Sequence, residues 1–227
     1  DCTLTISGEK FRYTMSMLTG MWQSMVSQGR KLLDRPMELN VWRAPTDNDM
    51  YIKAGWKRAH YSHPVIRACE SAYEKAGRNV QIHSTLSLSA ETVQRMMDVA
   101  VTWTVNAAGE IETSISVLRN PEFPDLPRFG LRMFLPKSVQ KVAYYGLGPN
   151  ESYPDKRRSS SHGLYVTDVP SLHEDYIRPQ ENGSHGDCDY VLVSNQRTQL
   201  AFTRDTPFSF NVSAHTPEEL TANADKY

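Results

Sequence analysis

Hydrophobic and polar side chains alternate with a period of two residues along much of this chain. Within Asn79–Ser89, apolar residues at Val80, Ile82, Leu86 and Leu88 are separated by single polar residues or by polar triplets. A period of two is typical of a β-strand that buries one face, because successive side chains of a strand point to opposite sides. This segment is therefore predicted to be a strand.

A β-hairpin is predicted directly after it. Val99–Val105 and Ile111–Val117 alternate in the same way on either side of the turn-forming segment Asn106–Gly109. Further strands are predicted at Phe11–Met15, Trp22–Ser27, Leu39–Arg43, Gly130–Leu135, Val139–Tyr145, Tyr190–Ser194, Gln199–Thr203 and Phe208–Val212. Many short strands separated by turn signals favour an all-β sandwich.

Helical signals are confined to two connecting segments, Ile52–His60 and Thr216–Leu220. In the second, Thr216 can cap the helix and Pro217 occupies the first helical position. A different kind of segment runs from Tyr144 to Asp189. It is rich in Gly, Pro, Ser, Asn and charge and is only weakly periodic, and loops this long are usually functional or lie against another part of a protein.

Length and composition suit one globular domain. The chain has 227 residues, 39% of them hydrophobic and 22% charged, and single all-β domains reach roughly 200–250 residues. No linker or repeat divides the sequence, so a single domain over residues 1–227 is expected.

Charge and apolar patterning exclude two classes of partner. The 25 Lys and Arg residues balance 26 Asp and Glu residues, so no field favours nucleic acid or an acidic membrane surface. No apolar stretch approaches the roughly 20 residues that span a bilayer, and the first residues do not resemble a signal peptide. Cys2, Cys69 and Cys188 are too few for a disulfide framework. A soluble, cytoplasmic protein is expected.

Two polar clusters contain residue types that can bind metal ions. Asp47, Asn48 and Asp49 carry ligands suited to a hard cation, but the spacing of a calcium loop is missing, and an Asx-rich turn that caps backbone N–H groups is the preferred interpretation. The segment Glu181–Cys188 contains a glutamate, a histidine, an aspartate and a thiol, but zinc sites need paired ligands at recurring spacing. No metal site is predicted in this chain.

No catalytic group can be assigned by spacing. A glycosidase needs two carboxyl groups roughly 5–10 Å apart, and the many acids here offer no unique pair. The Gly-x-Ser-x-Gly motif of a serine hydrolase is missing from the sequence. The residues alone thus predict a β-sandwich with unusual loops that face a carbohydrate or another subunit.

Three longer motifs resemble those of a known family. Asn40–Asp49 resembles the Trp-Arg-Ala-Pro-Thr-Asp-Asn-Asp motif near the start of the C-terminal small-chain domain of family 2 β-galactosidases. Tyr144–Asp155 resembles a second motif, Gly-x-Gly-Pro-x-Glu-Asn-Tyr-Pro-Asp, and Tyr176–Gly183 resembles a third. The resemblance extends from about Phe11 to Leu220.

This resemblance implies a fold and a division of labour. The family's domain is a large antiparallel β-supersandwich of the galactose-mutarotase-like type, and it continues past the segment at which this sequence stops. The expected function is that of a non-catalytic C-terminal domain, or small subunit, of a retaining β-galactosidase that hydrolyses terminal β-D-galactosides such as lactose. The catalytic glutamates lie on a separate TIM barrel, which is the expected partner, so the chain alone is expected to be inactive. No cofactor is expected in this chain, whereas divalent and monovalent cations and oligomerisation are expected of the complete enzyme.

The resemblance also implies residues that lie near the active site or at a domain interface. They are Gly29, Arg30, Arg43, Asp47, Asn48, Asp49, Glu151, Glu181 and Asn182. For Asp47 and Asp49 a structural role is preferred, in which the carboxylates cap the turn and one of them pairs with Arg43.

Two alternative functions come from other classes. A free-standing mutarotase-like epimerase would need a histidine and a glutamate across a cleft. A carbohydrate-binding module would display aromatic residues on a platform, and the four tryptophans are widely dispersed in the sequence: Trp22, Trp42, Trp56 and Trp103.

Overall fold

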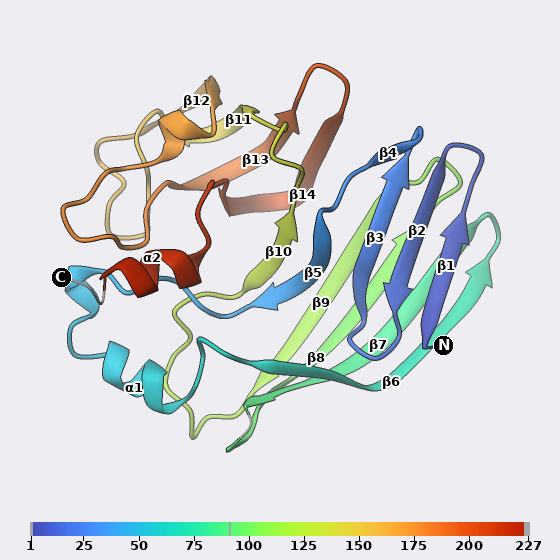
Figure 1. The fold of residues 1–227 in the computed structure, drawn as a ribbon, viewed down its shortest axis with the longest axis horizontal. Helices are drawn as coiled ribbons and strands as arrows, with labels where there is room; N and C mark the ends of the chain where they lie inside the picture. Colours follow the sequence, from blue (N-terminus) through green and yellow to red (C-terminus); the bar gives the residue numbers. More distant parts are fainter. Residues whose placement is uncertain (1, 91, 225–227) are drawn as a thin grey trace. The chain divides into compact units, whose positions relative to one another are not determined.

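The computed structural model of the chain describes residues 2–90 and 92–224, and strands dominate it (Figure 1). Strands make up 53% of the structure and helices 9%, arranged in several antiparallel sheets, which confirms the all-β sandwich prediction. The chain divides into two compact units, one formed by Asp1–Trp42 and Met50–Pro136 and the other by Arg43–Asp49 and Lys137–Tyr227. The expected single domain is not tested by this division and stays a prediction.

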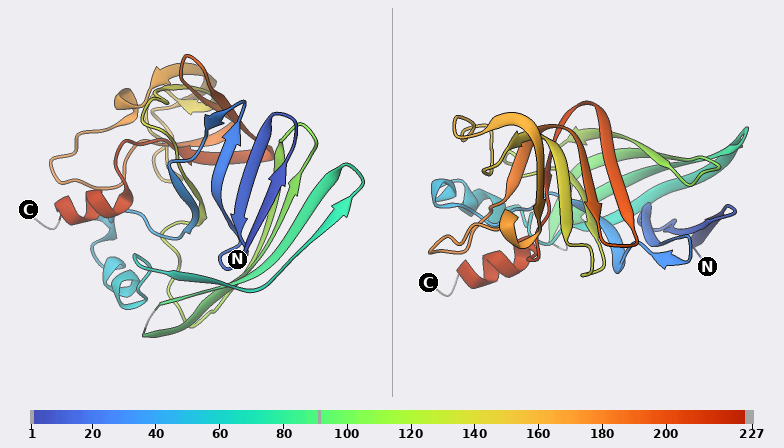
Figure 2. Two further views of the ribbon diagram at one scale, coloured as in Figure 1. Left: turned by 45° about the vertical axis from the view of Figure 1, so that its right-hand side comes forward. Right: turned by 90° about the horizontal axis from the view of Figure 1, so that it is seen from above.

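The first unit is built from two four-stranded antiparallel sheets and a strand pair (Figures 1 and 2). One sheet has the order β1-β2-β3-β4, the other β6-β7-β8-β9, and β5 pairs with β10. The strands are β1 (Thr3–Ser7), β2 (Phe11–Ser16), β3 (Met21–Ser27), β4 (Arg30–Lys31), β5 (Arg35–Asn40), β6 (Val65–Ala76), β7 (Asn79–Ala90), β8 (Val93–Val105), β9 (Ile111–Arg119) and β10 (Gly130–Phe134).

Aromatic packing joins the two larger sheets of this unit. Trp22 on β3 meets Trp103 on β8 edge to face, with ring centroids 5.7 Å apart. The Trp103 indole N–H also donates a hydrogen bond to the Gly20 carbonyl oxygen at 3.0 Å. Ile82 and Leu86, which the alternation placed on the inner face of β7, are fully buried. The apolar side chains on the inner faces of the two sheets thus form the core of a sandwich.

The second unit contains a single four-stranded antiparallel sheet of order β12-β11-β13-β14. Its strands are β11 (Lys141–Gly148), β12 (Ser161–Asp168), β13 (Ser184–Ser194) and β14 (Gln199–Asn211). The 3-10 turns η1 (Asp47–Asp49) and η2 (Pro170–Leu172) and the helix α2 (Pro217–Ala224) belong to the same unit.

Both predicted helical connectors exist, with shifted ends. The first is α1 (Lys53–Arg58), whose Trp56 is buried and donates its indole N–H to the Asp125 carbonyl oxygen. At the start of α2, the Thr216 hydroxyl accepts from the Glu219 N–H, and the Glu219 carboxylate accepts from the Thr216 N–H. This reciprocal pair is a capping box, which fixes where the helix begins.

Among the helices of the described residues, none is long and apolar enough to cross a bilayer.

Three strand predictions were wrong in detail. The strand predicted at Leu39–Arg43 ends at Asn40, because the Asn40 side chain accepts the Trp42 N–H at 3.2 Å and turns the backbone. The two strands predicted between Gln199 and Val212 are one strand, β14. Its register with β13 shifts on both sides of Cys188, so the alternation breaks while the pairing continues.

The third error concerns the long segment from Tyr144 to Asp189, which contains β12 as well as parts of β11 and β13. β12 pairs with β11 alone and forms an edge of the sheet. None of its residues is fully buried, so its apolar alternation is weak. The pattern also did not predict β6, of which no residue is fully buried, or the short strands β1 and β4.

Candidate functional site

The three motif segments come together in the second unit. The Asp47 N–H donates to the Gln180 side-chain oxygen at 3.1 Å, and the Glu181 N–H donates to the Ala44 carbonyl oxygen at 3.2 Å. These bonds tie the first motif to the third. The Gly183 N–H donates to the Glu151 carboxylate at 2.8 Å and ties the third motif to the second. Residues more than a hundred positions apart thus form one cluster.

Glu151 is the centre of this cluster. Its side chain is 4% exposed, and the Lys156 ammonium donates to it at 2.5 Å. The Tyr176 hydroxyl donates to the same carboxylate oxygen, and Lys156 also donates to the Tyr176 oxygen at 3.0 Å. Together with the Gly183 N–H, these donors occupy both oxygens of a buried carboxylate, as a charge removed from water requires.

The cluster keeps Glu151 ionised. Burial by itself would raise its pKa, but the hydrogen bonds from Lys156, Tyr176 and Gly183 outweigh burial and lower the pKa of the carboxyl below its ordinary value. In return, the bond to Glu151 raises the pKa of Lys156 and that of Tyr176. Glu151 therefore acts as a fixed anion at neutral pH rather than as a proton donor.

Acid should weaken the second unit through this group. Because the folded-state pKa of Glu151 lies below its ordinary value of 4.5, its stabilising contribution is fully present above that pH and is lost as the pH falls through the folded value. We expect the free energy of unfolding to decline below about pH 4.5, and to decline less steeply in Glu151→Gln. Urea unfolding between about pH 3 and 7 measures both slopes. If the free energy of unfolding fell equally steeply with pH in the unsubstituted chain and in Glu151→Gln, Glu151 would not be the group responsible.

Gly183 has a backbone that few other residues could adopt. Its φ is +71°, in the left-handed region, and a Cβ at this position would clash with the Leu172 carbonyl oxygen. Only glycine can adopt this positive φ without strain and also avoid the clash, because it has no Cβ. This conformation aims the Gly183 N–H at Glu151.

The acidic residues of the first motif differ in environment. Asp49 is 7% exposed, and its carboxylate accepts from the Arg43 guanidinium at 2.7 Å and from the Thr46 N–H at 2.8 Å. The predicted turn cap and Arg43 ion pair are therefore confirmed for Asp49. Asp47 and Asn48 are exposed, and no side-chain hydrogen bond of either is found among the described residues. For Asp47, a structural role of the carboxylate is not supported, because its backbone N–H alone makes the contact with Gln180.

Glu181 and Asn182 are buried in the third motif. The Asn211 amide donates to the Glu181 carboxylate at 3.1 Å and to the Asn182 carbonyl oxygen at 2.7 Å. The Asn182 amide donates to the Gln180 carbonyl oxygen, and its side-chain oxygen accepts the Glu174 N–H. These contacts hold the loop before β13 against the end of β14.

A second buried group lies on the inner side of the same sheet. The ring of His185 packs on Tyr144 at 4.6 Å and lies 3.0 Å from the Leu147 carbonyl oxygen through Nδ1. Burial lowers the pKa of His185, so the ring is neutral. Burial also raises the pKa of the Cys188 thiol to about 11, and the Cys188 sulfur fills the space where a Cβ of Gly146 would lie.

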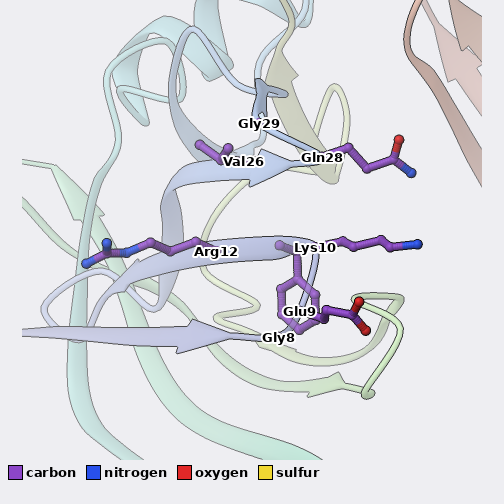
Figure 3. Close-up of a pocket in the computed structure, with 8 residues that line it drawn as sticks. Gly8, Glu9, Lys10, Arg12, Val26, Gln28 and Gly29 are labelled. Carbon is purple, nitrogen blue, oxygen red and sulfur yellow. The ribbon is translucent and has the colours of Figure 1, made fainter.

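Gly29 and Arg30 belong to the first unit, whereas the other candidate residues belong to the second. Gly29 lies in the turn between β3 and β4, and Arg30 is the first residue of β4. A shallow pocket of about 600 Å³ adjoins this turn and is lined in part by Glu9, Lys10 and Gln28. In Figure 3 the Lys10 and Gln28 side chains extend in one direction and Arg12 in the other. Arg12 therefore does not converge with Lys10 and Gln28 on one point of the pocket.

Within residues 2–90 and 92–224, no three His, Cys, Asp or Glu side chains lie close enough to hold a metal ion.

Lys156, Tyr176 and Gln180 belong to the cluster but were not among the candidate residues expected from the sequence. Lys156 lies just beyond the second motif, and it reaches Glu151 because a turn pairs Tyr153 with Lys156. A basic residue five positions after a motif glutamate, across Pro154, is a signal that could have found it.

Comparisons with known proteins agree with the sequence motifs. The profile of a family described as "Beta galactosidase small chain" matches residues 7–227. The chain is 34% identical to a β-galactosidase of Actinobacillus pleuropneumoniae, over 99% of this chain and 22% of that protein. It is 31% identical to a β-galactosidase of Staphylococcus xylosus, over 96% and 22%. It is also 31% identical to a β-galactosidase small subunit of Latilactobacillus sakei, over 97% and 78%. The chain thus spans about a fifth of the length of the first two relatives.

Proposed function

Because this chain belongs to the β-galactosidase small-chain family, we propose that it is the non-catalytic part of an enzyme that hydrolyses terminal β-D-galactosides such as lactose. The family match over residues 7–227 carries this proposal. The proposed reaction proceeds with retention of configuration. It needs two carboxyl groups roughly 5 Å apart that are free to act on the sugar, and these come from the part of the enzyme outside this chain.

The state of the buried carboxylates supports this division of labour. Glu151 and Asp49 are each held by several donors and a cation, so neither is available to transfer a proton or to attack a sugar. Glu181 is buried and accepts from Asn211. Glu151, Asp49 and Glu181 thus maintain the shape of the motif loops, and these loops are what the chain contributes to the enzyme.

In the complete enzyme, the loops around Gly29–Arg30 and Arg43–Asp49 border the active site opposite a catalytic TIM barrel. The exposed Asp47 and Asn48 side chains are suited to this role, because their polar atoms are not used within the loop. We further propose that the enzyme is cytoplasmic and oligomeric and that any cations it needs are bound outside this chain. Length supports a large partner region, since the chain spans 22% of the Actinobacillus relative.

The purified chain should not hydrolyse a chromogenic β-galactoside, whereas the complete enzyme that contains it should. The physical reason is that the two reactive carboxyls are proposed to lie in the part of the enzyme outside this chain. A steady-state assay of both proteins at equal molar concentration measures this. Turnover by the chain alone that disappears when one of its own carboxylates is replaced by an amide would show that the catalytic site lies here.

The epimerase alternative is less well supported. It requires a histidine and a glutamate that reach a bound sugar. His185 and the two glutamates Glu151 and Glu181 are buried in this unit, and all three are shielded from solvent and engaged in hydrogen bonds. Incubation with α-galactose, followed by polarimetry, tests this alternative directly.

A further inference from the structure

The sheet of the second unit has an apolar outer face. Directly opposed residues of antiparallel strands share a face, so the strand register gives the rows of side chains that cross the sheet from β12 to β14. One row consists of Leu164, Tyr145, Tyr190 and Thr203, and the next of Val166, Ala143, Leu192 and Ala201. The alternate residues, among them Tyr144 and Val191, are buried on the opposite face.

These rows are accessible in the chain by itself. Leu164 is 61% exposed and Val166 is 75% exposed, and both lie on the edge strand β12. Beside them, the rings of Tyr145 and Tyr190 lie nearly parallel, with centroids 6.3 Å apart. A contiguous patch of this kind, bounded on one side by the charged pair Lys141 and Asp168, is typical of a surface that another protein covers.

The first unit shows that the chain can build a solvated sheet face. The outer rows of β7, β8 and β9 are almost entirely polar: Gln81, Thr104 and Glu112; His83, Thr102 and Ser114; Thr85, Ala100 and Ser116; Ser87, Asp98 and Leu118. A sheet that faces water on one side has this hydrophilic alternation. The apolar rows of the second unit are therefore not a by-product of strand propensity.

We propose that this outer face, centred on Leu164, Val166 and Tyr145, is the docking surface for the part of the β-galactosidase that lies outside this chain. The inference rests on the proposed function. Since the chain spans 22% of the Actinobacillus relative, roughly four fifths of such a polypeptide is tethered beside it. Tethering gives that region a high effective concentration at the face, which a second copy from solution does not have.

The chemistry of the face also favours a protein over a sugar. Specific sugar sites need a few precisely placed polar groups, whereas five of the eight side chains in the two rows are leucine, valine or alanine and offer no hydrogen bonds, and hydroxyls come only from Tyr145, Tyr190 and Thr203. An apolar protein surface that packs against these rows would remove water from both apolar surfaces, which is favourable.

Photo-cross-linking in the complete enzyme tests the proposal. The photoreactive residue p-benzoylphenylalanine is placed at Val166 and, as a matched reference on the polar face, at Ser114. After irradiation, we expect the Val166 site to join peptides from outside this chain with at least tenfold the yield of the Ser114 site. Mixed isotope labelling identifies joining to a second copy. Joining only to a second copy, or a yield no higher than at Ser114, would overturn the proposal.

Hydroxyl-radical labelling of the unsubstituted enzyme covers the case in which the bulky probe disturbs the surface. Leu118, which is 72% exposed in the chain, serves as the reference for Leu164 and Val166. We expect the latter two to be oxidised at least fivefold more slowly than Leu118. Equal rates would overturn the inference. A β-galactosidase assay on the same sample separates the two claims: an active enzyme with a freely labelled face refutes only the docking surface, whereas an inactive enzyme refutes the proposed function.

Discussion

Glu151→Ala is expected to lower the free energy of unfolding of the second unit by about 3 kcal/mol, because it leaves hydrogen-bond donors around a buried carboxylate without their acceptor. The Gly183 N–H and the Tyr176 hydroxyl would lose their acceptor, and Lys156 would lose its counter-ion. Urea unfolding followed by circular dichroism measures the change.

Two further variants separate the contributions to this effect. Glu151→Gln keeps an acceptor for the Gly183 N–H and should cost less than Glu151→Ala. Lys156→Met removes a side chain that is 50% exposed, so it should cost no more than about 1 kcal/mol. If Glu151→Ala were no more destabilising than Lys156→Met, the carboxylate would not be the centre of the cluster.

Asp49→Ala should cost about 3 kcal/mol, whereas Asp47→Ala should change stability by less than about 0.5 kcal/mol. The first substitution leaves the Thr46 N–H and the Arg43 guanidinium without their acceptor, and the second removes an exposed carboxylate. The two residues are a matched pair, two positions apart in one turn. Thermal melting of the chain, beside kinetics of the complete enzyme, measures both effects.

The kinetic result distinguishes structure from catalysis. For Asp49→Ala we expect a lower yield of folded enzyme with little change in turnover per folded molecule. An unchanged melting temperature together with turnover reduced a hundredfold would show that Asp49 serves the active site directly.

The fold was predictable wherever a strand buries one face. β7, β8 and β9 alternate clearly because their inner residues, such as Ile82 and Trp103, fill the core of a sandwich. β6 and β12 were missed because hydrophobic and polar residues do not alternate regularly along them; in β12 the apolar Leu164 and Val166 lie on the exposed face. Other edge strands, β9 and β14, were predicted in whole or in part. The end of β5 was misplaced because it depends on one Asn40 side-chain bond that hydrophobic periodicity does not register.

The candidate site was predictable as three motifs but not as a cluster. Nothing in the sequence indicates that Gln180 meets the backbone of Asp47, because that contact depends on how two distant loops cross. Asp47 and Asp49 could not be told apart either, since they share one residue type in one motif, and only the direction of each side chain decides which is buried. The Arg43 partner was foreseen because a turn brings nearby opposite charges together.

The reactivity of Cys188 can be used to measure how often the sheet of the second unit opens. Its thiol is buried beneath Gly146 and has a pKa raised to about 11, so alkylating reagents can reach a reactive thiolate only in molecules whose sheet has transiently opened. Cys2 and Cys69 are exposed and would be modified first. The slow third modification would therefore follow the breathing of the β11–β13 pair, a motion that the tryptophan fluorescence of the first unit would not register.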